Sequence, residues 1–263
     1  MPDTSLRDVR AFWNRNPVAA ASVPHEPGTP EFFEYYDRLR ETRESVAFSH
    51  RLHEYSAFVD QRVLDVGCGN GYVLSRYARG GADVVGIDLT DTAVDLSRRR
   101  FALDGLRGQF VTGSAEALPF PSRTFACVSS MGVLHHTPDT SAAVREIWRV
   151  LEPGGRLVVM MYHQHSAVYR RLQLRSRREH RPLQELINEV DGTGNPKGAV
   201  YTRESLRALL VDFEDIDCSV GFLQGLPIGR RRRRFPPRVV LRPFASRWGW
   251  FLYAKARKPD VAA

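Results

Sequence analysis

Cysteine is scarce in this chain of 263 residues. The three cysteines, Cys68, Cys127 and Cys218, are odd in number and lie far apart in the sequence. This count and spacing argue against a disulfide framework and against a zinc site. The cysteines are expected to be buried thiols, and no metal site is predicted from them.

Long hydrophobic runs are also missing. Apolar residues make up 43% of the chain, yet no run of about 18 of them occurs, so no membrane-spanning helix is predicted. The N-terminus lacks the basic and then apolar order of a signal peptide. We therefore expect a soluble, cytoplasmic protein whose length allows one large domain or one domain with a cap.

Lysine occurs only at Lys197, Lys255 and Lys258, so 35 of the 38 basic residues are arginine. The net charge is +8. A general bias toward arginine weakens the argument that any single arginine serves chemistry, although the electrostatic consequences of the charge remain.

The most informative segment is a glycine-rich turn. Residues 62–66 are predicted to form a buried strand, and Gly67, Gly69 and Gly71 follow it at alternate positions. Glycine lets the backbone turn sharply and approach a ligand without a Cβ in the way. Asp88 ends the next predicted strand, about 20 residues after the first glycine, where an acid can accept both hydroxyls of a ribose. The pattern predicts a site for a nucleoside cofactor.

The glycine spacing separates this site from dinucleotide sites. The order Gly-x-Gly-x-Gly differs from the Gly-x-Gly-x-x-Gly of nicotinamide and flavin enzymes. Asp65 stands two residues before the first glycine, where a carboxylate would repel a diphosphate and attract an ammonium group. S-adenosylmethionine has an amino group, a sulfonium charge and no phosphate, so it suits this charge pattern.

Five segments in order resemble the class I S-adenosylmethionine-dependent methyltransferases, in the small-molecule branch that is similar to ubiquinone/menaquinone-biosynthesis enzymes. Residues 63–71 resemble motif I, and residues 86–90 resemble the strand end that binds ribose. Residues 113–120 resemble the loop that contacts adenine. Residues 125–136 resemble the fourth strand with its loop, and residues 146–157 resemble the helix, Pro-Gly-Gly turn and fifth strand.

The order of predicted elements indicates an α/β fold. Strands are predicted at 62–66, 82–88, 109–112, 125–130, 156–162, 214–220 and 250–257, with helices at 71–78, 92–103, 139–151 and 202–213. Their alternation predicts a mostly parallel sheet with helices on both faces. The resemblance implies a Rossmann-like sheet of seven strands in which the last strand is antiparallel.

The chain is expected to divide into a helical lid at 1–60 and a methyltransferase core at 61–263. Helices are predicted in the lid at 4–15, 31–43 and 44–58. Insertions at 163–201 and 221–249 leave the core and could build a cap over the site.

The resemblance implies which residues contact the cofactor. Asp65 is expected near the amino group of the methionine part, Asp88 on the ribose hydroxyls, and Leu89 on the adenine face. Tyr36, in the lid, is expected to cover the cofactor. The complete expected set is Tyr36, Asp65, Gly67, Cys68, Gly69, Gly71, Asp88, Leu89, Ser114, Ala115, Glu116, Met131 and Gly132.

Methyl transfer depends mainly on alignment and desolvation, and a base is needed only when the acceptor holds its proton tightly. The candidate catalytic residues lie near the carboxyl ends of the fourth and fifth strands: His136, His135, Tyr162 and His163. His136 is expected to orient the acceptor. The alternative for each histidine is a structural role, and their spacing matches no standard metal motif.

The predicted function is transfer of a methyl group from S-adenosylmethionine to an oxygen or carbon of a small-molecule acceptor, which leaves S-adenosylhomocysteine. The acceptor is expected to be a natural product, a glycolipid or a quinone-like compound. A binding protein without activity is disfavoured because the motif I acid, the glycines and the ribose acid are all present.

The run from Arg230 to Arg234 supports an alternative, an RNA methyltransferase, because arginines near Phe235, Phe244 and Trp248 could bind phosphates and stack on bases. The run could also contact anionic lipid, or form a solvated loop. Nucleic acid is disfavoured because no recognition domain and no Asn/Asp-Pro-Pro-Tyr/Phe motif are present. A homo-oligomer is left open.

Overall fold

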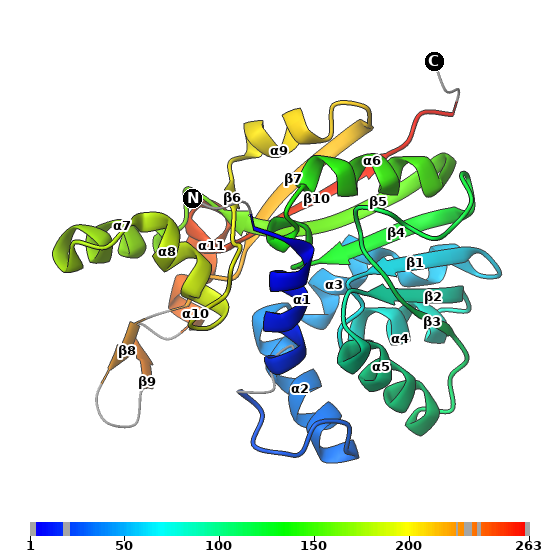
Figure 1. Cartoon of the computed structure of the whole chain (residues 1–263), viewed down its shortest axis with the longest axis horizontal. Helices are drawn as coiled ribbons and strands as arrows, with labels where there is room; N and C mark the ends of the chain where they lie inside the picture. The colour runs from blue at the N-terminus through cyan, green and yellow to red at the C-terminus, as the bar shows by residue number, and fades with distance from the viewer. Residues whose placement is uncertain (1–3, 18–21, 225, 229–232, 236–237, 261–263) are drawn as a thin grey trace.

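The computed structural model describes residues 4–17, 22–224, 226–228, 233–235 and 238–260. One sheet has the strand order β3-β2-β1-β4-β5-β10-β7, and a short strand, β6, pairs with β5 at its end (Figure 1). The strands of this sheet are β1 Arg62–Val66, β2 Asp83–Asp88, β3 Gln109–Thr112, β4 Phe125–Met131, β5 Leu151–His163, β6 Val200–Tyr201, β7 Glu214–Gly221 and β10 Phe251–Arg257.

The strand directions confirm the predicted sheet. Strands β3, β2, β1, β4 and β5 are parallel to one another, whereas β10 is antiparallel to both β5 and β7. The carboxyl ends of the central strands therefore lie at one edge, as in other open α/β sheets that bind ligands there. Strand β6 was not predicted, because two residues give no periodic signal.

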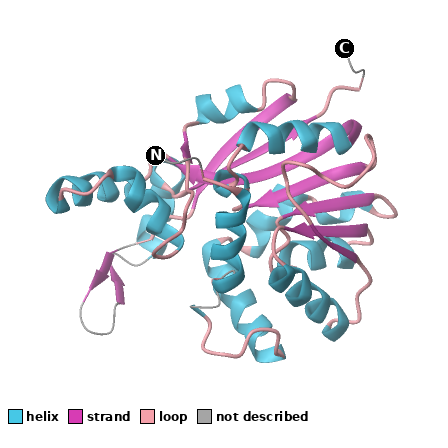
Figure 2. Cartoon of the chain, viewed as in Figure 1, coloured by secondary structure: helices cyan, strands magenta, loops and turns pink. Residues whose placement is uncertain are grey.

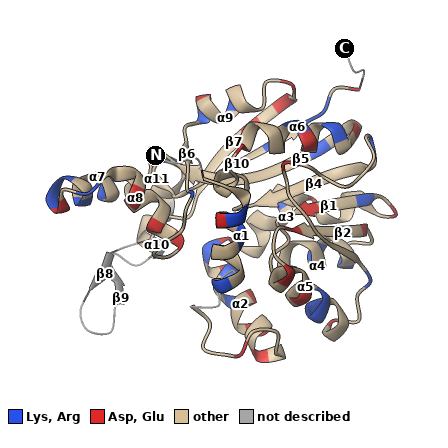
Figure 3. Ribbon diagram, viewed as in Figure 1, with Lys and Arg blue, Asp and Glu red and all other residues tan. Residues whose placement is uncertain are grey.

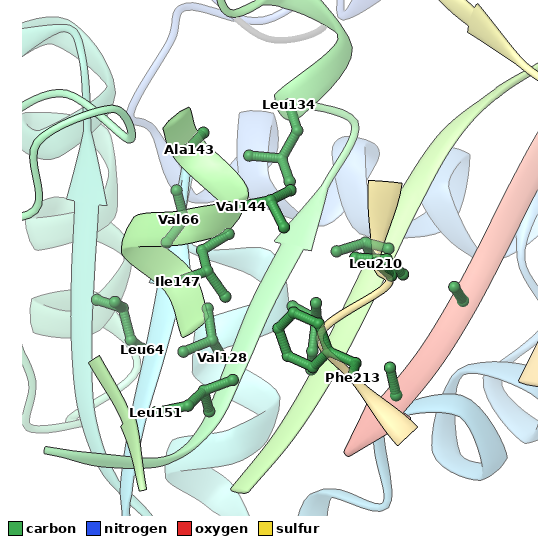
Figure 4. Packing of buried hydrophobic residues seen from close by; sticks show 14 of the residues in the cluster. Leu64, Val66, Val128, Leu134, Ala143, Val144, Ile147, Leu151, Leu210 and Phe213 are labelled. Atoms are coloured by element: carbon green, nitrogen blue, oxygen red, sulfur yellow. The ribbon is translucent and has the colours of Figure 1, made fainter. Parts of the chain in front are cut away.

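Alternate residues of each strand divide the core into two layers. On β5, Leu157, Val159 and Met161 pack on one face of the sheet, together with β1 residues Leu64 and Val66. Helices α6 (Thr140–Val150) and α9 (Arg203–Leu209) cover that face, and Figure 4 shows α6 side chains directed at the strands. The period of two along each strand thus fixes which side chains meet which helix.

The opposite face is covered by helices from the first hundred residues. Val63, Val158 and Met160 point to this face and pack with side chains of α2 (Pro30–Arg43), α3 (Val46–His53), α4 (Tyr72–Arg79) and α5 (Asp91–Leu103). Figure 2 shows helices on both sides of the strands, as predicted. Asp65 and Cys127 also belong to this side by the same alternation, and both are buried.

The predicted helix at 44–58 is wrong in two respects. The segment forms two elements, α3 and the short 3-10 helix η2 (Tyr55–Phe58), and the first of them begins at Val46. Glu44 is extended because its buried carboxylate accepts a hydrogen bond from the Tyr253 hydroxyl (2.7 Å) and pairs with Arg40 (2.9 Å). Glu54 has left-handed backbone angles (φ 49°), which end α3. Tertiary contacts of this kind override helix propensity.

Helix α1 (Leu6–Arg15) begins with a capping box between Ser5 and Asp8 and lies across the carboxyl edge of the strands (Figure 1). Its position is fixed by Arg10, whose Nε donates to the Leu89 carbonyl (2.8 Å). At its start the Thr4 hydroxyl donates to the Pro196 carbonyl (3.3 Å). These two contacts join the N-terminal helix to the loop after β2 and to the segment 163–201.

The two insertions project from the same side of the molecule (Figure 1). The first contains α7 (Ala167–Glu179), α8 (Leu183–Asn188) and η4 (Glu189–Asp191). The second contains β8 (Leu226–Ile228), β9 (Arg233–Phe235), α10 (Arg238–Leu241), η5 (Arg242–Phe244) and α11 (Ala245–Trp248). Figure 3 shows basic residues along α7. The arginine run from Arg230 to Arg234 is only partly described: residues 230–232 lie outside the described residues.

Within the described ranges, no helix is both long enough and apolar enough to cross a membrane. Cys68 and Cys127 are buried thiols, and Cys218 is half-buried.

Candidate active site

A cavity of about 690 Å³ opens at the carboxyl edge of the sheet and is bounded by the strand ends, α1, α2 and η4. Among the described residues, it gathers most of the expected cofactor set. Those that line it are Tyr36, Asp65, Gly67, Cys68, Gly69, Asp88, Leu89, Ser114, Ala115, Met131 and Gly132. The sequence motifs, which are scattered over about 100 residues, therefore converge on one site.

Two expected cofactor residues do not line the cavity. Gly71 precedes α4 with φ 76°, and a Cβ there would lie 3.2 Å from the Ser97 hydroxyl, so its place is in the packing of α4 on α5. The Glu116 carboxylate accepts a hydrogen bond from the backbone N–H of Asp139 (2.9 Å), next to the start of α6. Both residues support the loops beside the cavity.

The glycine turn brings backbone close to the cavity. Gly67 has φ 77°, and a Cβ at this position would lie 2.2 Å from Val133 Cγ2, so only glycine fits there. The N–H groups of Gly67 and Cys68 both donate to the Ile87 carbonyl (2.7 and 3.0 Å). The turn is thereby held against the end of β2, where Asp88 stands.

Asp88 is held in one orientation by its neighbours. One carboxylate oxygen accepts from the Gly69 N–H (3.1 Å), and the other accepts from the Thr90 N–H (3.0 Å) and hydroxyl (2.9 Å). Burial raises the pKa of Asp88, and these hydrogen bonds oppose the shift. The oxygen that accepts from Gly69 receives only this one hydrogen bond, so it keeps a lone pair for a ligand hydroxyl.

Asp65 is a buried acid at the end of β1 with an unused acceptor. It is 3% exposed, and its Oδ1 has no hydrogen-bond partner in the described part of the chain. Burial raises the pKa of Asp65 to about 7, while the Ser129 hydroxyl on the adjacent strand and the positive charge of Arg40 act in the opposite direction. A buried acid with an open lone pair is suited to a cationic ligand group.

Arg40 is a basic residue of the cavity that was not predicted. Its side chain pairs with Glu44, but its buried Nε–H has no hydrogen-bond partner among the described residues. Burial opposes the charged form, yet Glu44 and nearby tyrosines raise the pKa of Arg40, which stays protonated. Tyr36, Arg40 and Arg43 all line the cavity, and their spacing of four and three residues puts them on one face of α2. That spacing from Tyr36 is the signal that could have identified Arg40.

A second group of polar side chains in the cavity lining centres on Asp191, at the end of η4. Its Oδ1 accepts a hydrogen bond from the Tyr162 hydroxyl (2.7 Å), and its Oδ2 lies 3.4 Å from His136 Nε2. The other ring nitrogen of His136, Nδ1, lies 2.6 Å from the Lys197 carbonyl oxygen. The Trp13 ring packs edge-on against the His136 ring, with centroids 5.1 Å apart. Asp191 lies in the predicted insertion at 163–201 but was not predicted as a site residue, because no sequence pattern connects it with Tyr162.

His135 and His163 lie outside the cavity lining. His135 is fully buried between the rings of His136 and Tyr162, and neither of its ring nitrogens has a hydrogen-bond partner in the described ranges. Burial holds the pKa of His135 well below its usual range. His163 Nδ1 lies 3.1 Å from the Gly249 carbonyl. Of the four candidate catalytic residues, His136 and Tyr162 are those that reach the cavity.

The sequence and the fold are similar to those of known methyltransferases. Residues 64–159 match the family described as Methyltransferase domain. The ubiquinone/menaquinone biosynthesis C-methyltransferase UbiE of Enterobacter sp. (strain 638) is 36% identical over 107 residues, which is 39% of this chain and 43% of that protein. The chain therefore matches less than half of the length of this curated relative.

Solved structures of methyltransferases have a similar fold over most of the chain. A SAM-dependent methyltransferase from Methanosarcina mazei is 24% identical with a TM-score of 0.57, covering 80% of this chain and 97% of that one. Phosphoethanolamine N-methyltransferase 2 of Haemonchus contortus, in complex with phosphomonomethylethanolamine and S-adenosylhomocysteine, is 16% identical with a TM-score of 0.61, covering 98% of this chain and 62% of that one. The domain match over residues 64–159, the relatives and the sheet topology together show that this chain is similar to S-adenosylmethionine-dependent methyltransferases and shares their fold.

Proposed function

We propose that this chain binds S-adenosylmethionine in the cavity and transfers its methyl group to an oxygen or carbon of a small-molecule acceptor. The observation that carries the proposal is a pair of oppositely charged side chains, Asp65 and Arg40, each with a buried polar atom that has no hydrogen-bond partner among the described residues. Both line one cavity, beside a glycine turn that a Cβ would block.

The two charges suit the amino acid part of the cofactor. An amino acid presents an ammonium group and a carboxylate on one carbon, so it needs an anionic and a cationic partner close together. Asp65 Oδ1 can accept from the ammonium group, and the Arg40 Nε–H can donate to the carboxylate. A diphosphate would gain from Arg40 but would be repelled by both Asp65 and Asp88.

The remaining lining residues suit the adenosine part. The fixed Asp88 carboxylate can accept a hydrogen bond from a ribose hydroxyl at the oxygen that faces Gly69. Leu89 and Ala115 line the same cavity and can enclose the adenine ring. The residues present thus fit the whole cofactor, including its lack of phosphate.

When bound, the cofactor supplies a methyl group on a positively charged sulfur, which is already a good leaving group. The protein then needs only to align the acceptor and exclude water. Trp13, Met160 and Phe251 provide apolar parts of the cavity lining, and α1 lies over its edge. These features support an acceptor that is largely apolar and ring-shaped. The name of the Enterobacter relative, a ubiquinone/menaquinone biosynthesis C-methyltransferase, supports a quinone-like compound.

The test is methyl transfer from S-adenosylmethionine labelled in its methyl group. The full chain is incubated with a panel of natural phenols, hydroquinones and glycolipids, and labelled products are separated from the donor. Transfer to at least one acceptor, lost in Asp88→Ala, is expected. Asp91→Ala is the matched control, since Asp91 is an exposed acid nearby that does not line the cavity. Label that stays in the donor with every acceptor, although the cofactor binds, would contradict the proposed transfer to these compounds.

A further inference from the structure

Asp191, His136 and Tyr162 form a connected polar group in the cavity, and the geometry fixes the tautomer of neutral His136. A carbonyl oxygen can only accept, so the short contact with Lys197 requires a proton on His136 Nδ1. The basic nitrogen of neutral His136 is therefore Nε2. This nitrogen faces Asp191 Oδ2 at 3.4 Å.

Two hydrogen-bond acceptors that face each other in this way lack a hydrogen-bond donor between them. Neutral Nε2 and ionised Oδ2 both carry lone pairs, and Oδ2 is buried without a hydrogen-bond partner among the described residues. The other oxygen, Oδ1, is already occupied by the Tyr162 hydroxyl. The place beside Nε2 and Oδ2 consequently calls for a ligand group that donates a proton.

We propose that Asp191 is a positioning residue that makes His136 the base for an acceptor carrying an ionisable ring hydroxyl, a phenol or an enol. The inference rests on the proposed methyl transfer, because it names the acceptor class of the same site. His136 touches the acceptor hydroxyl, and Asp191 acts through His136.

The proton transfer balances as follows. The O–H bond of the acceptor breaks, its proton moves to His136 Nε2, and its electron pair stays on the oxygen. That pair either forms the new bond to the methyl carbon or enters the ring and makes a ring carbon the nucleophile. The electron pair of the broken carbon–sulfur bond stays on sulfur, and His136 later releases the proton to solvent.

The charges around His136 favour this role. On the η3 helix (Leu134–His136), neutral His135 lies against it; on β5 Tyr162 faces it, and on η4 Asp191 faces it. Burial lowers the pKa of His136, and the Asp191 carboxylate and the Lys197 carbonyl oppose that shift. Arg43 of α2 acts on Tyr162 rather than on His136. His136 is thus neutral and able to accept a proton at neutral pH, and Asp191 stabilises the imidazolium that results.

The inference is tested by nitrogen NMR of the full chain labelled at histidine, with S-adenosylhomocysteine as the probe ligand. His136 signals are assigned by their loss in His136→Gln. Neutral His136 is expected to carry its proton on Nδ1. In Asp191→Asn, which keeps the shape of the side chain, the pKa of His136 is expected to fall by about one to three units. In Tyr162→Phe, which keeps the carboxylate, it is expected not to fall.

A proton on Nε2 of neutral His136, or an unchanged pKa of His136 in Asp191→Asn, would overturn the inference. The result does not depend on finding the acceptor. Affinity for S-adenosylhomocysteine, measured on the same samples, is a separate readout: its absence contradicts the proposed function, whereas a wrong tautomer with normal affinity contradicts only the role of Asp191.

The acceptor class has its own readout once a substrate is found. A hydroquinone is expected to be methylated, and its diether, which has no O–H, is expected not to be. The rate with the hydroquinone is expected to rise with pH as His136 becomes neutral, and Asp191→Asn is expected to move that rise to lower pH. Equal turnover of both compounds would contradict the class.

Discussion

Asp65 combines burial with a carboxylate oxygen that no described residue uses. Burial raises the pKa of Asp65 from 3.8 to about 7 in the free protein. The protonated form of Asp65 therefore contributes stability to the folded state, which is fully present below pH 3.8 and is lost as pH rises through about 7. The shift corresponds to about 4 kcal/mol. A ligand ammonium group offsets this loss, which connects the affinity for the cofactor to pH.

Affinity for S-adenosylhomocysteine is therefore expected to increase with pH between 6 and 8, by about tenfold, as Asp65 ionises near pH 7. Asp65→Asn should bind weakly and with no such dependence. Calorimetric titrations at several pH values check both expectations. An affinity of the unmodified protein that is constant between pH 6 and 8 would show that the Asp65 carboxylate does not contact the ammonium group.

Arg40 can be separated from the rest of the site by the choice of ligand. Arg40→Gln is expected to lower the affinity for S-adenosylhomocysteine about ten- to a hundredfold, since a hydrogen bond to a charged group contributes about 1.5–3 kcal/mol. Adenosine has no carboxylate, so its affinity should be unchanged. The control Arg38→Gln alters an exposed arginine of the same helix. A parallel loss of adenosine affinity would assign Arg40 a structural role instead.

Residues of the glycine-rich segment and Asp88 could be assigned to one site from the sequence because their signal depends on local spacing. Asp65, Gly67, Gly69 and Asp88 all line the cavity, as the sequence predicts. Asp191 was not identified, since its contact with Tyr162 depends on how an insertion folds back onto the sheet.

The unit of strand, glycine turn and helix from β1 to α4 positions the site, and its geometry depends on contacts with β4 and the loop after it. Gly67 meets Val133 at a distance that leaves no room for a Cβ, and it has a positive φ. Gly105 also has a positive φ (64°), but nothing lies within 4 Å of its Cβ position. Replacing Gly67 by alanine therefore combines a steric clash with backbone strain, whereas replacing Gly105 causes backbone strain alone.

Gly67→Ala is expected to lower the free energy of unfolding by about 2–4 kcal/mol, from backbone strain and overpacking together. Gly105→Ala should lower it by only about 1 kcal/mol, from the backbone alone. Adding Val133→Ala to Gly67→Ala should recover part of the loss. Chemical denaturation measures all three variants. Equal losses at Gly67 and Gly105 would contradict the close approach to Val133.

Elements were predicted best where the pattern is local and periodic. The strands β1 and β3 have the predicted bounds, and α5 begins one residue earlier than predicted. The helix predicted at 44–58 begins late, and Glu44 is extended where its carboxylate contacts Arg40 and Tyr253. The contact with Tyr253 joins residues 209 positions apart, and no local pattern encodes it.

In the whole molecule, the strand ends and the first hundred residues enclose the cavity together. Arg10 and Thr4 join α1 to the core and to the first insertion, so the cover of the cavity is assembled from three separate parts of the chain. The parallel sheet with helices on both faces followed from the alternation of strands and helices, and the antiparallel last strand followed from the family resemblance. The path of the insertions did not, because their packing on the lid depends on side chains that have no periodic arrangement.

The central claim is that the cavity is a site for S-adenosylmethionine, and calorimetry with S-adenosylhomocysteine tests it most directly. Binding at micromolar concentration or tighter is expected for the full chain, with loss of most of the affinity in Asp88→Ala and none in Asp91→Ala. No heat of binding to the unmodified, folded protein, or equal affinity in Asp88→Ala, would contradict the claim.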